Sequence, residues 1–190
     1  MTKLLTRNRL YGLALALAVF GFDRGLKYLL LGPLHLRERG SIELLPIFRF
    51  TYVQNIGVSL GMLPASSTEM RFLLVGATAA IALVVLVWMM RERKLWDIFP
   101  LSLILGGALS NILDRYLYGY VVDYADLHFG EFRPFLIINL ADAAITIGVV
   151  IILARTLFLR EKRSDAGESA GPAPASEPPD QPAQEAAETN

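Results

Sequence analysis

The chain has 190 residues, of which 54% are hydrophobic, and its mean hydropathy is +0.44. This composition excludes an ordinary soluble domain and is typical of a small polytopic membrane protein. The formal net charge is zero, but residues 164–190 hold six acids and no base, so residues 1–163 carry about +6, with 18 basic against 12 acidic residues. Because cysteine is absent, disulfides, iron–sulfur clusters and a cysteine nucleophile are excluded.

The first predicted membrane span covers residues 11–31. Asp23 and Lys27 lie four residues apart in its second half, a spacing that indicates an ion pair on one helical face. Gly21 and Gly25 have the spacing of a close-packing site between helices. The apolar stretch is too long for a cleavable signal peptide, and no small-residue cleavage pattern follows it.

A strand-rich loop follows the first span. Residues 42–53 are rich in Ile, Leu, Phe, Tyr and Val and partly alternate in polarity, and Val121–Phe129 further along has a similar pattern. We expect the two segments to form a small sheet on the outer membrane surface. Within the second segment, Asp126 and His128 are expected to be solvated loop residues.

Three further spans are predicted at residues 72–90, 98–118 and 135–159. Basic residues precede the first span, fill the link between the second and third, and follow the fourth, so both termini are expected in the cytoplasm. The predicted fold is therefore an all-α membrane protein with four transmembrane helices and a small β-sheet in its outer, periplasmic loops. Residues 164–190, rich in Ala, Pro, Glu and Ser, are expected to form a disordered cytoplasmic tail outside this domain of residues 1–163.

The most informative residue is Asp142, which lies inside the apolar run of residues 135–154. A carboxylate within a spanning helix costs at least a few kcal/mol, so its presence indicates a functional role. Two carboxyl groups that share one proton can activate water for peptide hydrolysis, as in aspartyl proteases. Asp123 has no adjacent base and is the preferred partner of Asp142. Asp114, adjacent to Arg115, is expected to be structural, but the pair of Asp114 and Asp142 remains the main alternative.

The predicted polar groups of all spans converge on the outer leaflet. This arrangement favours an enzyme that works at the membrane surface. The competing hypothesis is a small ion- or proton-coupled transporter that uses intramembrane acids as relays, although such a protein would more naturally place polar groups along the whole membrane depth.

Five ordered motifs within residues 10–160 resemble those of the lipoprotein signal peptidase (signal peptidase II) family. They are Asp23-x-x-x-Lys27, Asn55-x-Gly57-x-Ser59, residues 106–115 ending in Asn111-Ile-Leu-Asp114-Arg115, Val121-Val-Asp123-Tyr124, and Asn139-Leu-Ala141-Asp142. The order of the motifs, rather than any single one, carries the resemblance. The chain departs from the residues common in the family at Leu60, Tyr124 and Ala143.

The resemblance implies an aspartyl endopeptidase of the bacterial inner membrane, without a cofactor or metal, whose active site faces the periplasmic leaflet. Such an enzyme removes the signal peptide of prolipoproteins before a diacylglyceryl-modified cysteine. The implied partners are these substrates and membrane lipids, with no nucleic acid, and we expect a monomer. The implied catalytic pair is Asp123 and Asp142. The implied substrate-binding or supporting residues are Asp23, Lys27, Asn55, Gly57, Asn111, Asp114, Arg115, Asn139 and Ala141.

Overall fold

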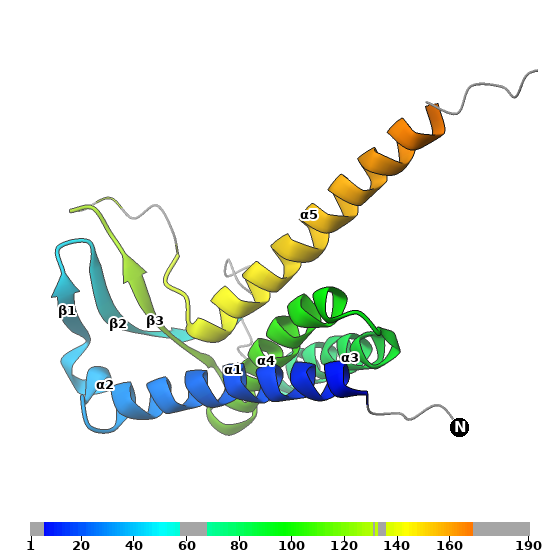
Figure 1. The fold of residues 1–190 in the computed structure, drawn as a ribbon. Helices are drawn as coiled ribbons and strands as arrows, with labels where there is room; N and C mark the ends of the chain where they lie inside the picture. Colours follow the sequence, from blue (N-terminus) through cyan, green and yellow to red (C-terminus); the bar gives the residue numbers. More distant parts are fainter. Residues whose placement is uncertain (1–5, 58–67, 131, 133–135, 169–190) are drawn as a thin grey trace, which may run out of the picture. The chain divides into compact units, whose positions relative to one another are not determined.

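The computed structural model describes residues 6–57, 68–130, 132 and 136–168, and Figure 1 shows their path. Ser59 and Leu60 of the sequence motifs lie outside these residues. The elements in chain order are α1 (Arg7–Leu31), α2 (Leu36–Arg39), β1 (Ser41–Leu45), β2 (Phe48–Asn55), α3 (Thr68–Arg91), α4 (Leu95–Tyr118), β3 (Val121–Leu127) and α5 (Leu140–Glu168).

Three of the described helices are long and apolar enough to cross a membrane, over Arg71–Arg91, Leu95–Tyr118 and Leu140–Leu157. These stretches correspond to the second, third and fourth predicted spans. The first predicted span forms α1, which is 25 residues long but carries three charged residues near its end, Asp23, Arg24 and Lys27. Because of these three charged residues, α1 does not meet the criteria of length and composition by which the other three helices qualify as candidate membrane spans.

Helix α4 packs against both α1 and α3. Buried apolar side chains from the three helices, including Ala16, Met89 and Leu101, form one core. The close approach of α1 involves Gly106 of α4, where an added Cβ would meet the backbone of Ala16. The prediction for Gly21 and Gly25 was wrong, because no described atom lies within 4 Å of a Cβ built at either position.

The predicted sheet is confirmed as a three-stranded antiparallel sheet of order β1-β2-β3. The register pairs Val53 with Asp123 and Asn55 with Val121, so Asn55 lies diagonally next to Asp123. The sheet is joined to the end of α1 by a second apolar core built on Leu30, Leu36 and Tyr124.

Asp126 and His128 are buried rather than solvated, which corrects the sequence prediction. The strand register places Asp126 opposite Arg49. The Arg49 guanidinium lies 2.8 Å from the Asp126 carboxylate, which also accepts a hydrogen bond from Thr51. Strand pairing across the sheet, which local sequence does not specify, therefore supplies the partners that make burial of this acid possible.

Helix α5 begins at Leu140, not near residue 135 as predicted. Ile138 is still paired with Ala125 of β3 through backbone hydrogen bonds, so the chain at this residue belongs to the edge of the sheet and not to the helix. Asn139 then caps the helix through its side-chain oxygen, which accepts from the amide of Asp142 at 2.8 Å. Asp142 is thus in the first turn of α5, and not well inside a span.

The chain divides into two compact units, residues 1–154 and residues 155–190. The first unit contains the helices and the sheet described above. In the second unit the structure describes the continuation of α5 to Glu168. Residues 169–190, most of the predicted tail, lie outside the described residues.

Candidate active site

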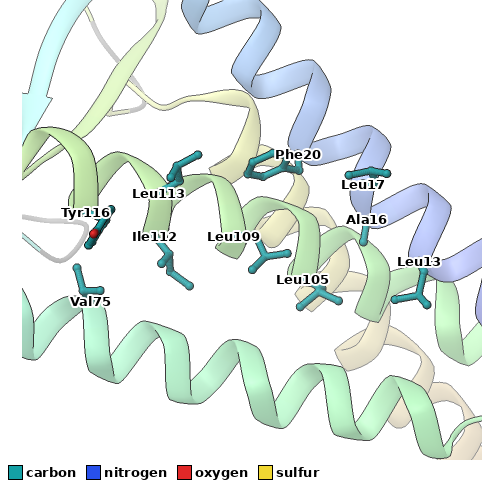
Figure 2. Close-up of a pocket in the computed structure, with 10 residues that line it drawn as sticks. All are labelled: Leu13, Ala16, Leu17, Phe20, Val75, Leu105, Leu109, Ile112, Leu113 and Tyr116. Atoms are coloured by element: carbon teal, nitrogen blue, oxygen red, sulfur yellow. The ribbon is translucent and has the colours of Figure 1, made fainter.

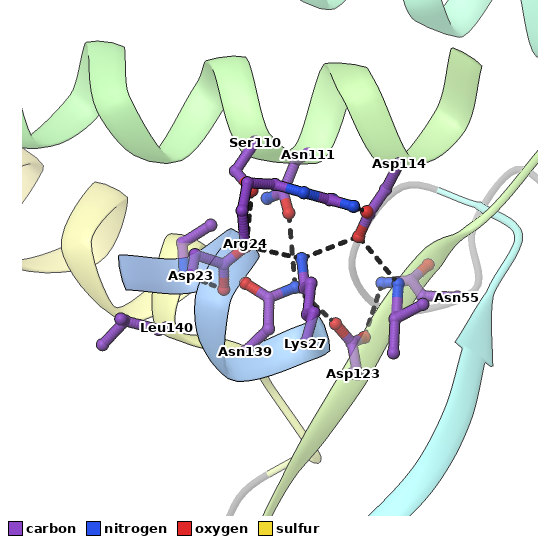
Figure 3. A network of polar contacts seen from close by, with 12 residues as sticks. Asp23, Arg24, Lys27, Asn55, Ser110, Asn111, Asp114, Asp123, Asn139 and Leu140 are labelled. Carbon is purple, nitrogen blue, oxygen red and sulfur yellow. Dashed lines mark hydrogen bonds and ion pairs between the residues drawn. The ribbon is translucent and has the colours of Figure 1, made fainter. Parts of the chain in front are cut away.

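Polar side chains from α1, β2, α4, β3 and the start of α5 meet where the ends of α1 and α4 approach the sheet (Figure 3). Their positions follow from helical spacing, because Ser110 and Asp114 of α4 lie one turn apart, as do Asp23 and Lys27 of α1. All four side chains are buried, with relative exposures of 0 to 1%. The close contact at Gly106, one turn before Ser110, brings these two faces together.

Asp114 has three bonding partners among the described residues, and none of them is its sequence neighbour Arg115. Its carboxylate lies 2.7 Å from Lys27, pairs with Arg24, and accepts the backbone N–H of Val122 at 3.1 Å. The sequence suggested Arg115 as its partner, but both cations come from α1. A fully buried carboxylate is tolerated only with such compensation, so Asp114 joins α1, α4 and the start of β3.

Asp23 occupies a similar position on α1. Its carboxylate lies 2.7 Å from Lys27 and accepts a 2.5 Å hydrogen bond from Ser110. The predicted ion pair of Asp23 and Lys27 is therefore present in the structure, but it is part of a network with Asp114 rather than an isolated pair. Asp23 also accepts the backbone N–H of Ala141 at 3.3 Å, so it reaches the first turn of α5.

Asp123, which is 3% exposed, is held by two amides. Asn55 donates to one of its oxygens at 3.1 Å and Asn139 to the other at 2.7 Å. Burial and then the negative charge of Asp142 raise the pKa of Asp123 to about 7, while the two amide donors and Lys27 act in the opposite direction. A carboxyl group whose pKa lies near neutral pH is suited to accept and donate a proton.

Asp142 is half-buried and belongs to the same hydrogen-bond chain. Asn111 donates to its carboxylate at 2.7 Å, and the oxygen of Asn111 accepts from Asn139 at 3.3 Å. Asn139 therefore contacts Asn111 and Asp123 through its amino group and the backbone of Asp142 through its oxygen. The two acids share Asn139 and have no Lys or Arg bonded directly to either carboxylate among the described contacts.

Arg115 lies beside this pair and donates to the carbonyl of Gly57 at 3.1 Å. Gly57 in turn donates its N–H to the side chain of Asn55, a turn that aims the Asn55 amino group at Asp123. Arg71 of α3 donates to the carbonyls of Arg115 and Tyr116 and so closes the end of α4. The Asn55-x-Gly57 motif thus belongs to the site.

Residues 15–158 match the family model of signal peptidase II. The chain belongs to the signal peptidase II family. It is 47% identical over 156 residues to the lipoprotein signal peptidase of Sphingopyxis alaskensis. The aligned region covers 82% of this chain and 90% of that protein. The lipoprotein signal peptidase of Rhizorhabdus wittichii is 46% identical over 156 residues, covering 82% and 91%. The predicted family resemblance is therefore confirmed.

Two solved structures of bacterial membrane enzymes have a similar fold. One, determined by the in meso method at 2.3 Å resolution, has a TM-score of 0.67 and is 28% identical, covering 77% of this chain and 87% of its own. The other, at 1.9 Å, has a TM-score of 0.64 and is 30% identical, covering 77% and 92%. As a member of the signal peptidase II family the protein is a protease, and its apolar helices are those of a multi-pass membrane protein.

All the site residues predicted from the sequence fall in this one region of the signal peptidase II fold. Sequence reasoning did not identify Arg24 and Ser110. Arg24 is adjacent to Asp23 but pairs with Asp114, and Ser110 is one turn from Asp114 but donates to Asp23, so each contacts an acid of the other helix. Ala141 contributes its backbone N–H and not its side chain. Among the described residues, no cluster of three or more His, Asp or Glu side chains is arranged to hold a metal ion.

A cavity of about 500 Å³ lies between α1, α3 and α4 (Figure 2). Its lining is apolar except for Tyr116, and it includes Leu13, Phe20 and Leu109. Ile112 and Leu113 also face it, so α4 presents one apolar side to this cavity and its polar residues elsewhere. None of the described residues that line the cavity has an acid or amide side chain that could take part in hydrolysis.

Proposed function

We propose that this protein is an aspartyl endopeptidase that removes the signal peptide from prolipoproteins. It cleaves the peptide bond before a diacylglyceryl-modified cysteine, using water activated by Asp123 and Asp142. The observation that carries this proposal is the position of Asn139, whose side chain bonds the carboxylate of Asp123 and the backbone of Asp142. A single residue at the start of α5 thus restrains both acids, one in β3 and one in α5.

The chemistry requires the two acids to hold one proton between them. Like charges held close together do not both ionise cheaply, which favours this state. The ionised carboxylate takes a proton from water, while the protonated carboxyl group donates a hydrogen bond to the carbonyl oxygen of the scissile bond. Proton transfer to the departing nitrogen then breaks the C–N bond, and the attacking oxygen remains in the new carboxyl terminus of the signal peptide.

The partners of Asp114 argue against the alternative pair of Asp114 and Asp142. Lys27, Arg24 and the N–H of Val122 occupy the acceptor sites of the Asp114 carboxylate. Two cations and a backbone N–H thus surround this carboxylate, which has little capacity left to bind and activate water. The pair of Asp123 and Asp142 has amide partners instead, which leaves both carboxyl groups able to gain or lose a proton.

We further propose that α1 also spans the membrane, which gives four transmembrane helices in all. Its charges do not prevent insertion, because Asp23 and Lys27 pair with each other and Arg24 pairs with Asp114. Paired charges that face the interior of a helix bundle are the form in which membranes tolerate ionised side chains. The family match begins at residue 15, within α1.

The distribution of basic residues supports an orientation with both termini in the cytoplasm. The basic residues of the α3–α4 link, Arg91, Arg93 and Lys94, lie at the helix ends opposite the sheet, so the sheet and the polar site face the periplasmic leaflet. All the polar residues of the site gather at this end of the helices. A transport pathway would need them along the full depth, so the distribution favours the peptidase over the transporter.

The proposed substrate fits this location. Its acyl chains remain in the lipid and its modified cysteine lies near the interface, beside the acids. Asn111 and Arg115 are proposed to bind the unwound backbone of the cleavage segment, since unsatisfied peptide groups cost several kcal/mol each in lipid. We propose that residues 1–163 carry this activity as a monomer in the bacterial inner membrane, and that residues 164–190 form a tail outside the catalytic part.

The test uses purified full-length protein and two synthetic prolipoprotein peptides, with and without the diacylglyceryl group on cysteine. We expect cleavage of the lipidated peptide immediately before the cysteine, identified by mass spectrometry, and an unchanged rate in the presence of a metal chelator. The unmodified peptide is the matched control and should be cleaved far more slowly. Cleavage at another bond, equal cleavage of both peptides, or loss of activity with the chelator would contradict the proposal.

A further inference from the structure

The first three amides of α5 need acceptors from outside the helix, as in every α-helix. The structure supplies each of them with a side-chain oxygen. Leu140 donates to the hydroxyl of Tyr124 at 3.0 Å, Ala141 to Asp23 at 3.3 Å, and Asp142 to Asn139 at 2.8 Å. Two of these three acceptors come from other elements, β3 and α1, so the start of α5 is capped mainly by its neighbours.

Tyr124 connects the three elements. Its hydroxyl accepts from Leu140 and donates to Asp23 at 3.2 Å. Burial, followed by the charge of Asp23, raises the pKa of this hydroxyl above its ordinary value, so it stays protonated and able to donate. Tyr124 immediately follows Asp123 in β3, and Leu140 lies two residues before Asp142.

The ring of Tyr124 gives this hydroxyl a fixed position. Tyr124 is 2% exposed and belongs to the apolar core with Leu30 and Leu36. Its ring also packs edge to face against Phe50, with centroids 6.0 Å apart. Because the ring is held by apolar contacts, loss of the hydroxyl alone removes the two hydrogen bonds and leaves the packing unchanged.

We propose that Tyr124 is a positioning residue, whose hydroxyl caps α5 and thereby fixes Asp142 relative to Asp123. Without the hydroxyl, the N–H of Leu140 loses its side-chain acceptor and Asp23 loses a donor, so the first turn of α5 opens more often. Asp142 lies in that turn, so its carboxyl group moves away from the geometry that catalysis requires. The catalytic part of this inference depends on the proposed function, whereas the capping part does not.

The experiment compares Tyr124→Phe with Tyr52→Phe in the full-length protein. Tyr52 is the matched control, since its hydroxyl also bonds within the sheet, to Tyr120 and Gln54, but makes no contact with α5. Backbone hydrogen exchange of residues 140–142 should rise by about tenfold in Tyr124→Phe, as expected for loss of a capping hydrogen bond. It should remain unchanged in Tyr52→Phe.

Cleavage kinetics give the second measurement. Tyr124→Phe should lower kcat by about fivefold or more with KM nearly unchanged, because positioning acts on the transition state. Tyr52→Phe should change neither. Faster exchange with an unaltered kcat per folded molecule would refute the positioning role, and unaltered exchange would refute the cap.

The wild-type protein provides a measurement that needs no variant. Thr6 precedes α1 without a side-chain cap, whereas the first turn of α5 has three. Amides 140–142 should therefore exchange more slowly than amides 7–9, and the reverse order would overturn the inference. Failure of the wild-type protein to cleave the lipidated peptide would refute the proposed function alone, since exchange reports on the cap without substrate.

Discussion

At the scale of single residues, the site separates two kinds of buried acid. Asp23 and Asp114 are paired with cations of α1, and these pairs compensate for the burial of both acids. Among the described residues, Asp123 accepts hydrogen bonds only from amides, and burial together with the charge of Asp142 raises its pKa to about 7. Environment rather than residue type therefore distinguishes the structural acids from the acids proposed to transfer protons.

This difference predicts the pH dependence of cleavage. The reaction needs one proton on the pair, so kcat/KM should fall as the pH rises through about 7 and both carboxyl groups ionise, with an apparent pKa that belongs to the pair. The Asn55 amide stabilises the ionised form of Asp123, so Asn55→Leu should raise the pKa of Asp123. The alkaline limb of the pH–rate profile should therefore move upward, by about half a pH unit or more.

Gln54→Leu is the matched control, because it removes the neighbouring amide of β2, which is exposed and bonds Tyr52 instead of Asp123. Its pH–rate profile should coincide with that of the wild-type protein. A downward shift in Asn55→Leu, or equal shifts in both variants, would contradict the assignment of this limb to Asp123.

At the scale of elements, close helix packing brings the acids together. Gly107 of α4 is in contact with α5, where an added Cβ would meet the backbone of Ala141 and lie 2.9 Å from the side chain of Ile145. Asn111 is one turn further along α4 and donates to Asp142. The distance between α4 and α5 at Gly107 therefore determines whether the bond between Asn111 and Asp142 forms.

Gly107→Ala should force α4 and α5 apart and lower both the melting temperature and kcat. We expect a loss of about tenfold or more in kcat, since small displacements of reacting groups have large effects on rate. Gly76→Ala in α3 is the control, because no described atom lies within 4 Å of a Cβ at that position. Wild-type kinetics and melting temperature in Gly107→Ala would mean that this contact does not position Asp142.

The elements also indicate how far local sequence predicts this fold. Alternating polarity predicted the strands, and apolar runs predicted the helices. The start of α5 was misplaced because it depends on pairing between Ile138 and Ala125, residues that come together only in the folded chain. In the same way, the ion pairs of Asp114 with Arg24 and Lys27 join residues about 90 positions apart, which spacing along one helix does not reveal.

At the scale of the whole molecule, the proposed topology places the sheet and the α3–α4 link on opposite sides of the membrane. The chain contains no cysteine, so single cysteines introduced at exposed positions report accessibility without background. Glu43 of β1 and Leu95 at the start of α4 are both exposed in the structure. Neither substitution removes a basic residue that sets the orientation.

In cells with an intact inner membrane, a membrane-impermeant maleimide applied from the periplasmic side should label Glu43→Cys. It should label Leu95→Cys only after the inner membrane is permeabilised. Labelling of both positions without permeabilisation would show an even number of crossings between them, or none, and would contradict the four-span topology, which has one crossing, α3, between them. The unmodified cysteine-free chain is the control for labelling.

The central claim is that one carboxyl group from β3 and one from the first turn of α5 together activate water. The most direct measurement is the rate at which Asp123→Asn and Asp142→Asn each cleave the diacylglyceryl peptide. Glu43→Gln serves as a control for the loss of an exposed acid from the same sheet. Both Asn variants should stay folded and lose activity by about a thousandfold or more, within the range of general acid–base catalysis, while Glu43→Gln retains the wild-type rate. Full activity in either Asn variant would contradict the account.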